Sequence, residues 1–431
     1  MNASFEVLRG CVVVRDGVIE QVLGSEEEAP RADRVLDLEG RTLVPGFVQS
    51  HIHCCQTLLR GMADDLALLD WLRQRVWPLE AAHDPQTLGA SARLTALELL
   101  LGGTTAVLTM ETVRHTDSVF EALRPLPIRA VVGKCLMDRG QDVPAGLLES
   151  KEQSLREALL LAARFPADPG ARLRACLAPR FALSCSEGLL REIAQESERT
   201  GLLVHTHGAE QKEEVKLVQQ ETGRRNIDYL QAVGLVSSRL RLAHAGHLSP
   251  KEERTLAACG SHVLHCASSN LKLGSGIAPI HRYLESGIPV SIGADAAPCN
   301  NNLDALREAR LASLLQKSLC GPTTLPARTA LELLTIGGAR ALGMEQEIGS
   351  IEPGKRADLV EFDLHQPHIV PAADPYSQLI YAADRSDITR VYVDGEVVVE
   401  HGQPLFCDPG QVLEAATQSA NTLATRAGLA R

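Results

Sequence analysis

The feature that most constrains the fold of this chain is a repeated alternation of short apolar runs with helix-like segments. The apolar runs of strand length are Leu43–His53, Thr104–Met110, Ile128–Leu136, Leu173–Arg180, Leu202–His207, Leu240–His244, Val263–Cys266 and Val290–Ala294. The helical patterns between most of them are Pro85–Leu101, Ser150–Arg164, Glu187–Thr200, Glu213–Ala232, Pro250–Cys259 and Leu303–Leu319. Eight strands that alternate with helices predict an α/β fold, a (β/α)8 barrel of the TIM type. The alternative is an open doubly wound sheet, but no GxGxxG pattern follows the first strand, so the barrel is favoured.

Both ends of the chain carry β segments of a different kind. Val12–Val14 and Val18–Val22 flank an Asp-Gly turn, which is a strong hairpin signal. Near the other end, Ala357–Asp363 has the pattern of a strand, and Ile388–Val399 has that of a hairpin around another Asp-Gly pair. Since strands from opposite ends of a chain can pair into one sheet, we expect a small β-sandwich that the barrel interrupts.

These patterns predict two domains. Residues 1–45 and 352–431 would form the small β-sandwich domain, which finishes in an Ala-rich helical tail at Gln411–Arg431. Residues 46–351 would form the barrel, which we expect to hold a metal ion.

Charge and cysteine usage exclude several classes of partner. Asp and Glu outnumber Lys and Arg by 54 to 43, a net charge of −11, whereas nonspecific nucleic-acid binding depends on basic residues. The apolar run Leu99–Met110 is too short to span a bilayer, and the opening residues lack the pattern of a secretory signal. Eleven cysteines without a CxxC pair are typical of buried thiols in a reducing compartment. We therefore expect a cytoplasmic protein with no nucleic-acid or membrane partner.

Residues that bind metals recur where the predicted strands end, which is the end of such barrels that carries chemistry. His51 and His53 end the first strand, and residues i and i+2 of a strand point to the same side. His207, His244 and Asp295 end three later strands. Each of them alone has an ordinary structural explanation, but their recurrence indicates one metal site. Imidazole nitrogens with one carboxylate suit Zn²⁺ and leave a position open for water.

Two histidine pairs leave a choice. His205 and His207 have the spacing of the first pair, and we choose His207 because Glu210, three residues later, can then lie beside the metal. His205 would support the site from behind. Of His244 and His247 we choose His244, because it directly follows the apolar strand.

With these residues the chain resembles the amidohydrolase superfamily. The more specific resemblance is to the branch of the methylthioadenosine/S-adenosylhomocysteine and 5′-deoxyadenosine deaminases, guanine deaminases and s-triazine hydrolases. It runs almost from end to end and rests on the motifs Leu43-Val-Pro-Gly-Phe-Val-Gln-Ser-His-Ile-His53, Pro78-Leu-Glu80, His205-Thr-His-Gly-Ala-Glu210, Leu242-Ala-His244, Ser269-Asn-Leu-Lys-Leu-Gly-Ser-Gly276, Gly293-Ala-Asp295 and Gly349-Ser-Ile-Glu-Pro-Gly-Lys-Arg-Ala-Asp-Leu359. These motifs are specific to the superfamily and much less specific to a substrate.

The resemblance implies one divalent metal ion per chain, with Zn²⁺ as the first choice and Fe²⁺ as the alternative. The residues that would hold it are His51, His53, His207 and Asp295. Members with two metals bridge them by a carboxylated lysine on strand four, and Leu173–Arg180 contains no lysine. We interpret Lys134, on the third strand, as structural.

The same resemblance implies catalytic roles for Glu210, His244 and Asp295. The metal would lower the pKa of a bound water to give hydroxide, Asp295 would accept the water proton, and His244 would align the hydroxide. Glu210 would protonate a ring nitrogen, after which hydroxide attacks the adjacent carbon and ammonia leaves. A metal-free binding protein of this fold would show gaps among these residues, and the sequence shows none.

Three further residues bear on the substrate, and they conflict. Glu80 matches the glutamate that binds ribose hydroxyls in the methylthioadenosine/S-adenosylhomocysteine deaminases, whereas Arg180 and Gln56 match residues that contact the purine in guanine deaminases. The whole-chain pattern favours hydrolytic deamination at C6 of an adenosine-type nucleoside: 5′-deoxyadenosine, methylthioadenosine or S-adenosylhomocysteine. The alternatives are a deaminase of guanine, 8-oxoguanine or a pterin, and after that an s-triazine hydrolase. By the same resemblance we expect a homo-oligomer.

Overall fold

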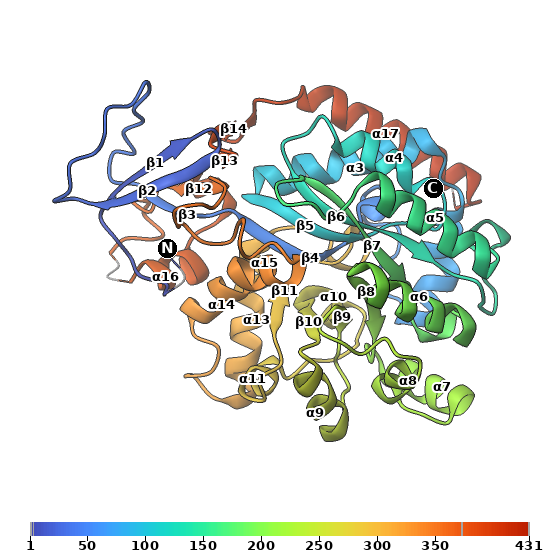
Figure 1. Cartoon of the computed structure of the whole chain (residues 1–431). Helices are drawn as coiled ribbons and strands as arrows, with labels where there is room; N and C mark the ends of the chain where they lie inside the picture. The colour runs from blue at the N-terminus through green and yellow to red at the C-terminus, as the bar shows by residue number, and fades with distance from the viewer. Residues whose placement is uncertain (1, 3, 372–373, 430–431) are drawn as a thin grey trace.

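The computed structural model, which describes residues 2, 4–371 and 374–429, contains a barrel of eight parallel strands (Figure 1). Neighbours in this sheet are neighbours in the chain: β4 (Phe47–Ile52), β5 (Thr104–Met110), β6 (Arg129–Leu136), β7 (Leu173–Pro179), β8 (Val204–Gly208), β9 (Leu240–His244), β10 (His262–His265) and β11 (Val290–Ile292). The chain closes the barrel just beyond β11, where the Asp295 amide donates to the His51 carbonyl at 2.9 Å. The predicted (β/α)8 fold is confirmed.

Helices lie around the outside of these strands (Figure 1). They are α3 (Pro85–Leu101), α4 (Thr116–Leu123), α5 (Lys151–Arg164), α6 (Glu187–Thr200), α7 (Lys212–Thr222), α8 (Asn226–Ala232), α9 (Pro250–Cys259), α10 (Ala267–Lys272), α11 (Ile280–Glu285), α12 (Ala297–Asn300), α13 (Ala305–Cys320), α14 (Ala327–Leu334) and α15 (Ile336–Leu342). Local capping explains where α9 begins and ends. The Ser249 hydroxyl accepts from the Glu252 amide at its start, and Gly260, with φ +65°, follows its end.

The predicted strand Leu43–His53 is wrong as a single element. It divides at Gly46 into β3 (Thr42–Pro45), which belongs to another sheet, and β4. A Cβ atom at Gly46 would lie 2.2 Å from the Thr105 hydroxyl oxygen, so only glycine lets the backbone pass this close to β5. The chain therefore changes sheets at this residue.

The predicted helix Glu213–Ala232 is also divided. It forms α7 and α8, and Gly223 follows α7 with φ +72° in the left-handed conformation that ends many helices.

The two ends of the chain meet in a second sheet, as predicted. Its strand order is β15 (Gln403–Pro404), β14 (Glu396–Glu400), β13 (Ile388–Val393), β12 (Leu359–Phe362) and β3. β3 pairs antiparallel with β12, so residues more than 300 positions apart lie opposite each other, for example Val44 and Val360. The hairpin of β1 (Gly10–Arg15) and β2 (Val18–Gly24) packs on this sheet through a buried cluster that includes Ile19, Leu359 and Tyr392.

The tail helix α17 (Pro409–Arg426) lies along α3 of the barrel (Figure 1). Its Leu423 is buried with Leu58 and Leu79, which follow the first barrel strand. The tail predicted at Gln411–Arg431 therefore contacts the barrel, and its last two residues lie outside the described part of the chain. The domain boundaries stay a prediction.

A buried ion pair joins the barrel to the second sheet. Arg129, the first residue of β6, donates from Nε to Asp358 Oδ2 at 2.7 Å and from Nη2 to Oδ1 at 3.1 Å. Asp358 directly precedes β12, and its Oδ1 also accepts from the Asp394 amide at 3.0 Å. This contact lies at the amino-terminal end of the barrel strands.

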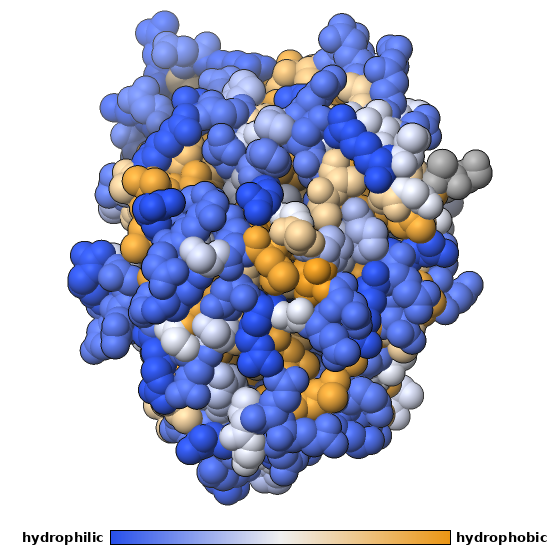
Figure 2. Space-filling model, turned by 90° about the vertical axis from the view of Figure 1, so that its right-hand side faces the viewer, coloured by the Kyte–Doolittle hydropathy of each residue, from blue (hydrophilic) through white to orange (hydrophobic). Residues whose placement is uncertain are grey.

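Hydrophilic side chains dominate the face shown in Figure 2, with hydrophobic residues gathered near its centre. Across the described residues, no helix combines the length and the apolar character that crossing a membrane requires.

Candidate active site

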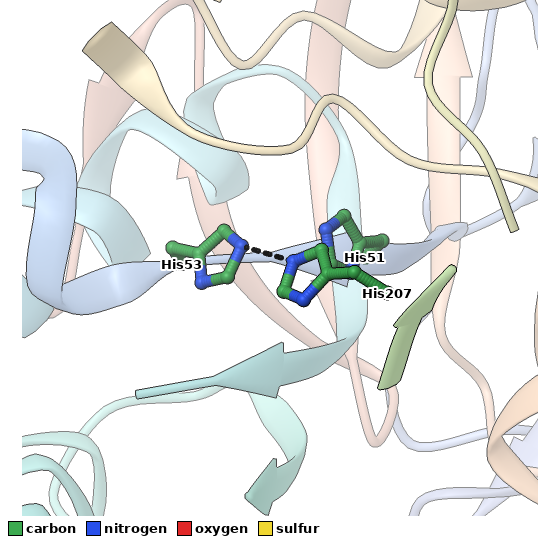
Figure 3. Close-up of side chains that lie close together, drawn as sticks. All are labelled: His51, His53 and His207. Atoms are coloured by element: carbon green, nitrogen blue, oxygen red, sulfur yellow. Dashed lines mark hydrogen bonds between the residues drawn. The ribbon is translucent and has the colours of Figure 1, made fainter. Parts of the chain in front are cut away.

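Four side chains meet at the carboxyl end of the barrel strands. His51 and His53 come from β4 and the residue after it, and His207 comes from β8; their rings face one another in Figure 3. His53 Nε2 and His207 Nε2 are 3.2 Å apart. Asp295 Oδ1 lies 3.2 Å from His51 Nε2 and 3.3 Å from His53 Nε2.

These spacings fit a metal site. Ligand atoms about 2.1 Å from one tetrahedral ion lie about 3.4 Å from each other, which is close to the separations above. His51 Nε2 is buried and, although Asp295 Oδ1 lies 3.2 Å away, it forms no well-directed hydrogen bond to a described residue, so an ion would satisfy it. Burial lowers the pKa of His51 to about 4 and that of His207 well below its usual value, which favours the neutral imidazoles that metals require.

The backbone fixes which ring nitrogen faces the centre. His53 Nδ1 lies 2.7 Å from the Met110 carbonyl, and His207 Nδ1 lies 2.7 Å from the Arg180 carbonyl. A carbonyl only accepts, so each Nδ1 carries the proton and each Nε2 keeps its lone pair.

His205, the alternative to His207, lies behind the cluster. Its Nε2 is 2.7 Å from Nδ1 of His51, so it contacts the first histidine on the side away from Asp295. His247, the alternative to His244, points elsewhere and lies 2.7 Å from the Ser275 carbonyl.

Asp295 is held as an ionised carboxylate. Burial raises its pKa, but the imidazoles of His51 and His244 outweigh burial and hold the pKa well below its usual range. Ser269 Oγ donates to its Oδ2 at 2.6 Å. Asp295 and His244 both have positive φ, +61° and +70°, in a region that residues with a side chain rarely adopt. The backbone is therefore strained at two of the predicted site residues.

Glu210 and His244 form a second pair beside the cluster. His244 Nε2 lies 3.4 Å from Glu210 Oε2 and 4.0 Å from Asp295 Oδ2. Burial raises the pKa of Glu210, His244 lowers it and the nearby Asp295 raises it, and together these effects bring it to about 7. Burial disfavours the charged form of His244, but Glu210 and Asp295 outweigh it and raise its pKa. Glu210 can therefore carry a proton near neutrality, whereas Asp295 cannot.

His51, His244 and Asp295 also lie close enough to hold an ion together, so His244 borders the same site. Lys134 does not reach it. Its ammonium group pairs with Glu149 Oε2 at 2.5 Å and both side chains are buried, while β7 carries no lysine.

Sequence reasoning missed the carboxylates and amides that hold these groups. Glu214 accepts from the Glu210 amide at 2.7 Å, and Asn270 Oδ1 lies 2.9 Å from His244 Nδ1. Glu111 accepts from the amides of Cys54 and Cys55, which directly follow His53. Glu214 had one available signal, since it stands in the first turn of the predicted helix Glu213–Ala232, four residues after Glu210.

The three predicted substrate residues form one hydrogen-bonded group. Arg180 Nη1 and Nη2 donate to Glu80 Oε2 and Oε1 at 2.6 and 3.2 Å, and Gln56 Nε2 donates to Glu80 Oε1 at 2.7 Å. Glu80 and Arg180, which indicate different substrates in the sequence, thus contact each other in the folded chain. The guanidinium group of Arg180 faces a carboxylate rather than an empty space.

One cavity touches both groups of residues. Its polar lining includes His53, Gln56, Arg180, His207, Glu210, Glu214, His244 and Asp295. Its apolar lining consists of Leu68, Trp71, Leu72, Phe181 and Leu273. Glu80 is not part of the lining and is only 2% exposed. A flat apolar body with a few polar groups fits such a pocket.

A (β/α)8 barrel whose strand ends bring histidines and one aspartate together defines a class of metal-dependent hydrolases. Residues 42–398 match the model of the Amidohydrolase family, and the chain belongs to this family.

Named relatives match almost the whole chain. It is 36% identical to a 5-methylthioadenosine/S-adenosylhomocysteine deaminase of Thermodesulfovibrio yellowstonii over 96% of this chain and 94% of the relative. It is also 36% identical to a 5'-deoxyadenosine deaminase of Methanothermobacter thermautotrophicus, over 97% and 95% of the two chains. Among solved structures, an adenosine deaminase from Xanthomonas campestris with bound zinc superimposes with a TM-score of 0.90 at 34% identity, covering 96% of this chain and 93% of that one.

Proposed function

We propose that this chain is a hydrolytic deaminase of an adenosine-type nucleoside, such as 5′-deoxyadenosine, methylthioadenosine or S-adenosylhomocysteine. The observation that carries the proposal is the buried acid Glu210, which lies beside His244 at the edge of the histidine and aspartate cluster. An acid with a pKa of about 7 suits protonation of a purine ring nitrogen at neutral pH. The names of the full-length relatives support the nucleoside as the substrate class.

One divalent ion, with Zn²⁺ as the first choice, would be held by His51, His53, His207 and Asp295. When bound, it would supply a water molecule of lowered pKa. The zinc found in the Xanthomonas campestris structure supports this choice over Fe²⁺. Metal analysis of the purified protein should give about one ion per chain, as an open catalytic site requires. Two ions per chain, or a carboxylated Lys134, would contradict the assignment.

The protein groups then move the protons. Asp295 accepts a proton from the attacking water, His244 orients that water by a hydrogen bond, and Glu210 protonates the ring nitrogen next to C6. The water oxygen bonds to C6, and Asp295 returns its proton to the amino group, which leaves as ammonia. Glu210 recovers a proton from the new hydroxyl group as it becomes the 6-oxo group, so both acids return to their starting states.

Gln56, Glu80 and Arg180 would recognise the part of the substrate away from C6. The Glu80–Arg180 ion pair supports a neutral ligand at this end of the cavity, because the guanidinium charge is already balanced.

The test of the proposed function is ammonia release from 5′-deoxyadenosine and from guanine at equal concentration. We expect 5′-deoxyadenosine to be turned over faster. Faster turnover of guanine would contradict the nucleoside assignment and would favour the alternative in which Arg180 and Gln56 contact the base.

We further propose that the enzyme works in the cytoplasm and as a homo-oligomer. All eleven cysteines are free thiols, which supports a reducing compartment. Cell fractionation tests the first expectation, and the mass of the purified protein in solution tests the second.

A further inference from the structure

The Gln56 side chain has one partnered end and one unpartnered end. Its Nε2 donates to Glu80 Oε1 at 2.7 Å, and because a carboxylate only accepts, the contact fixes the orientation of the amide. The other end, Oε1, is buried and has no hydrogen-bond partner among the described residues. Gln56 is 1% exposed and lines the cavity beside the metal-site residues. A buried acceptor without a donor is costly, so this oxygen is suited to a donor on a ligand.

Glu80 is in the opposite situation. Both of its carboxylate oxygens accept from Arg180, one of them also accepts from Gln56, and the side chain lies outside the cavity lining. Glu80 therefore acts on the cavity through the amide that it holds, whereas Arg180, which holds Glu80 in place, also lines the cavity itself.

We propose that Gln56 Oε1 accepts a hydrogen bond from a ribose hydroxyl of the substrate, with Glu80 and Arg180 as positioning residues. This inference rests on the proposed function and replaces the expected direct contact between Glu80 and the ribose. An adenosine-type nucleoside offers few donors. The purine amino group lies at the reacting C6 and the ring nitrogens carry no hydrogen, so in 5′-deoxyadenosine and methylthioadenosine the hydroxyls of the sugar are the donors that remain. S-adenosylhomocysteine adds only the ammonium group at the far end of its amino-acid chain.

The test compares kcat/KM for 5′-deoxyadenosine with kcat/KM for its 2′,3′-dideoxy analogue, which lacks both hydroxyls. The natural chain should prefer the hydroxylated substrate by about ten-fold or more, the effect of one well-placed buried hydrogen bond. Gln56→Met, similar in size and without an acceptor oxygen, should lose that preference through a higher KM for 5′-deoxyadenosine alone.

Gln49 offers a matched control, because it is a buried glutamine whose amide is fully partnered. Its Nε2 donates to Thr104 Oγ1 and the Leu303 carbonyl, and its Oε1 accepts from the Ala294 amide. Gln49→Met should change both substrates by the same factor. The melting temperature and metal content of every variant report whether it has folded.

The positioning role of Glu80 is tested in the same assay. Glu80→Gln alone should weaken the preference, and it should have no further effect on the preference in the Gln56→Met background, because Glu80 acts through Gln56.

Two results would overturn the inference. One is the absence of any preference in the natural chain, which needs no variant to fold. The other is a preference that survives Gln56→Met and is abolished by Glu80→Gln, which would identify Glu80 as the contact. Both can occur while 5′-deoxyadenosine is still deaminated, so they are distinct from failure of the proposed function, in which the natural chain releases ammonia from guanine and from neither nucleoside.

Discussion

Two buried arginine–carboxylate pairs lie at opposite ends of the barrel strands. Arg129 holds Asp358 where β6 begins, and Arg180 holds Glu80 just beyond the end of β7. Both pairs use two hydrogen bonds, and all four residues are at most 4% exposed. The chemistry of the two contacts is therefore almost the same.

Their surroundings differ. Asp358 also accepts from the Asp394 amide, and Arg129 Nη2 also donates to Asp394 Oδ1 at 2.5 Å, so protein atoms surround the pair. Arg180 instead borders a cavity, and Gln56 beside it keeps an unpartnered oxygen and lines the same cavity. Arg129 also has a buried unpartnered atom, Nη1, but it does not line this cavity. A contact of one kind thus joins two sheets at one end of the barrel and shapes a binding pocket at the other.

The largest effect should come from the cavity end. Glu210→Gln keeps the shape of the side chain and removes the acid, so kcat should fall by roughly 10² to 10⁴, the usual contribution of a general acid. Metal content and melting temperature should stay at their natural values. Loss of the metal in this variant would show that Glu210 is a ligand and would contradict its role in proton transfer.

A substitution at the other end of the barrel, in the Arg129–Asp358 pair, should change the stability of the protein instead of its kcat. Asp358→Ala leaves the Arg129 guanidinium buried without its main partner, which should lower the free energy of unfolding by about 3 to 5 kcal/mol. The kcat of the remaining folded enzyme should be unchanged. Denaturant unfolding and active-site titration measure the two quantities. Glu20→Gln, which breaks the exposed pair with Arg15, is the control and should cost less than about 1 kcal/mol. A fall in kcat with Asp358→Ala would show that the two ends are coupled.

The cavity end of the barrel contains a further buried acid, Glu308, which does not line the cavity. Burial raises the pKa of Glu308 to about 7 from the ordinary 4.5, and its carboxyl group accepts from Ser268 and Asn300. Because the folded pKa lies above the unfolded one, the stability that Glu308 contributes is fully present below pH 4.5 and is lost as the pH rises through about 7. At about 1.4 kcal/mol per pKa unit, the loss is about 3 kcal/mol.

Glu308→Gln removes this titration. The difference in unfolding free energy between the natural chain and the variant should therefore change by about 3 kcal/mol between pH 4.5 and pH 8, with the natural chain losing stability as the pH rises. Chemical denaturation at several pH values measures it. A difference that does not vary with pH would mean that Glu308 stays ionised in the folded chain.

The sequence predicts those parts of the fold and the site that depend on residues close together in the chain. The barrel and the cluster of His51, His53, His207 and Asp295 follow from local rules, since alternation fixes the strands and strand ends collect at one end of a parallel barrel. The division at Gly46 depends on its close contact with Thr105 of the next strand, which the sequence does not show, although the Pro45-Gly46 pair is itself a local signal for a break.

The pairing of Glu80 with Arg180 was beyond sequence reasoning for the same reason. The two residues are 100 positions apart, and each matched a different family pattern, so they looked like competing signals. Only the fold shows that one neutralises the other. Glu111 was missed because it acts through a neighbour, and a lone buried carboxylate carries no pattern of its own. Asn270 stands in the motif Ser269–Gly276, but the motif alone does not show that its side chain contacts His244.

The smallest effect that we expect concerns backbone strain, which has different consequences in the small sheet and in the barrel. Three two-residue turns of the small sheet and its hairpin have positive φ at both positions: Asp16-Gly17, Asp394-Gly395 and His401-Gly402. Such turns favour Asn or Asp followed by Gly, so His401 is the exception.

His401 is exposed and contributes a backbone hydrogen bond, from its amide to the Thr389 carbonyl at 2.7 Å. His401→Asn should therefore raise the free energy of unfolding by about 0.5 kcal/mol and leave kcat unchanged. Asp16→Asn, at a turn that already has a favoured residue, is the control and should change stability less. At the barrel end, by contrast, the positive φ values fall on His244 and Asp295, where the side chain is needed, so that strain cannot be removed without loss of activity. An unchanged or lowered stability of His401→Asn would mean that the histidine ring makes a contact that offsets its backbone strain.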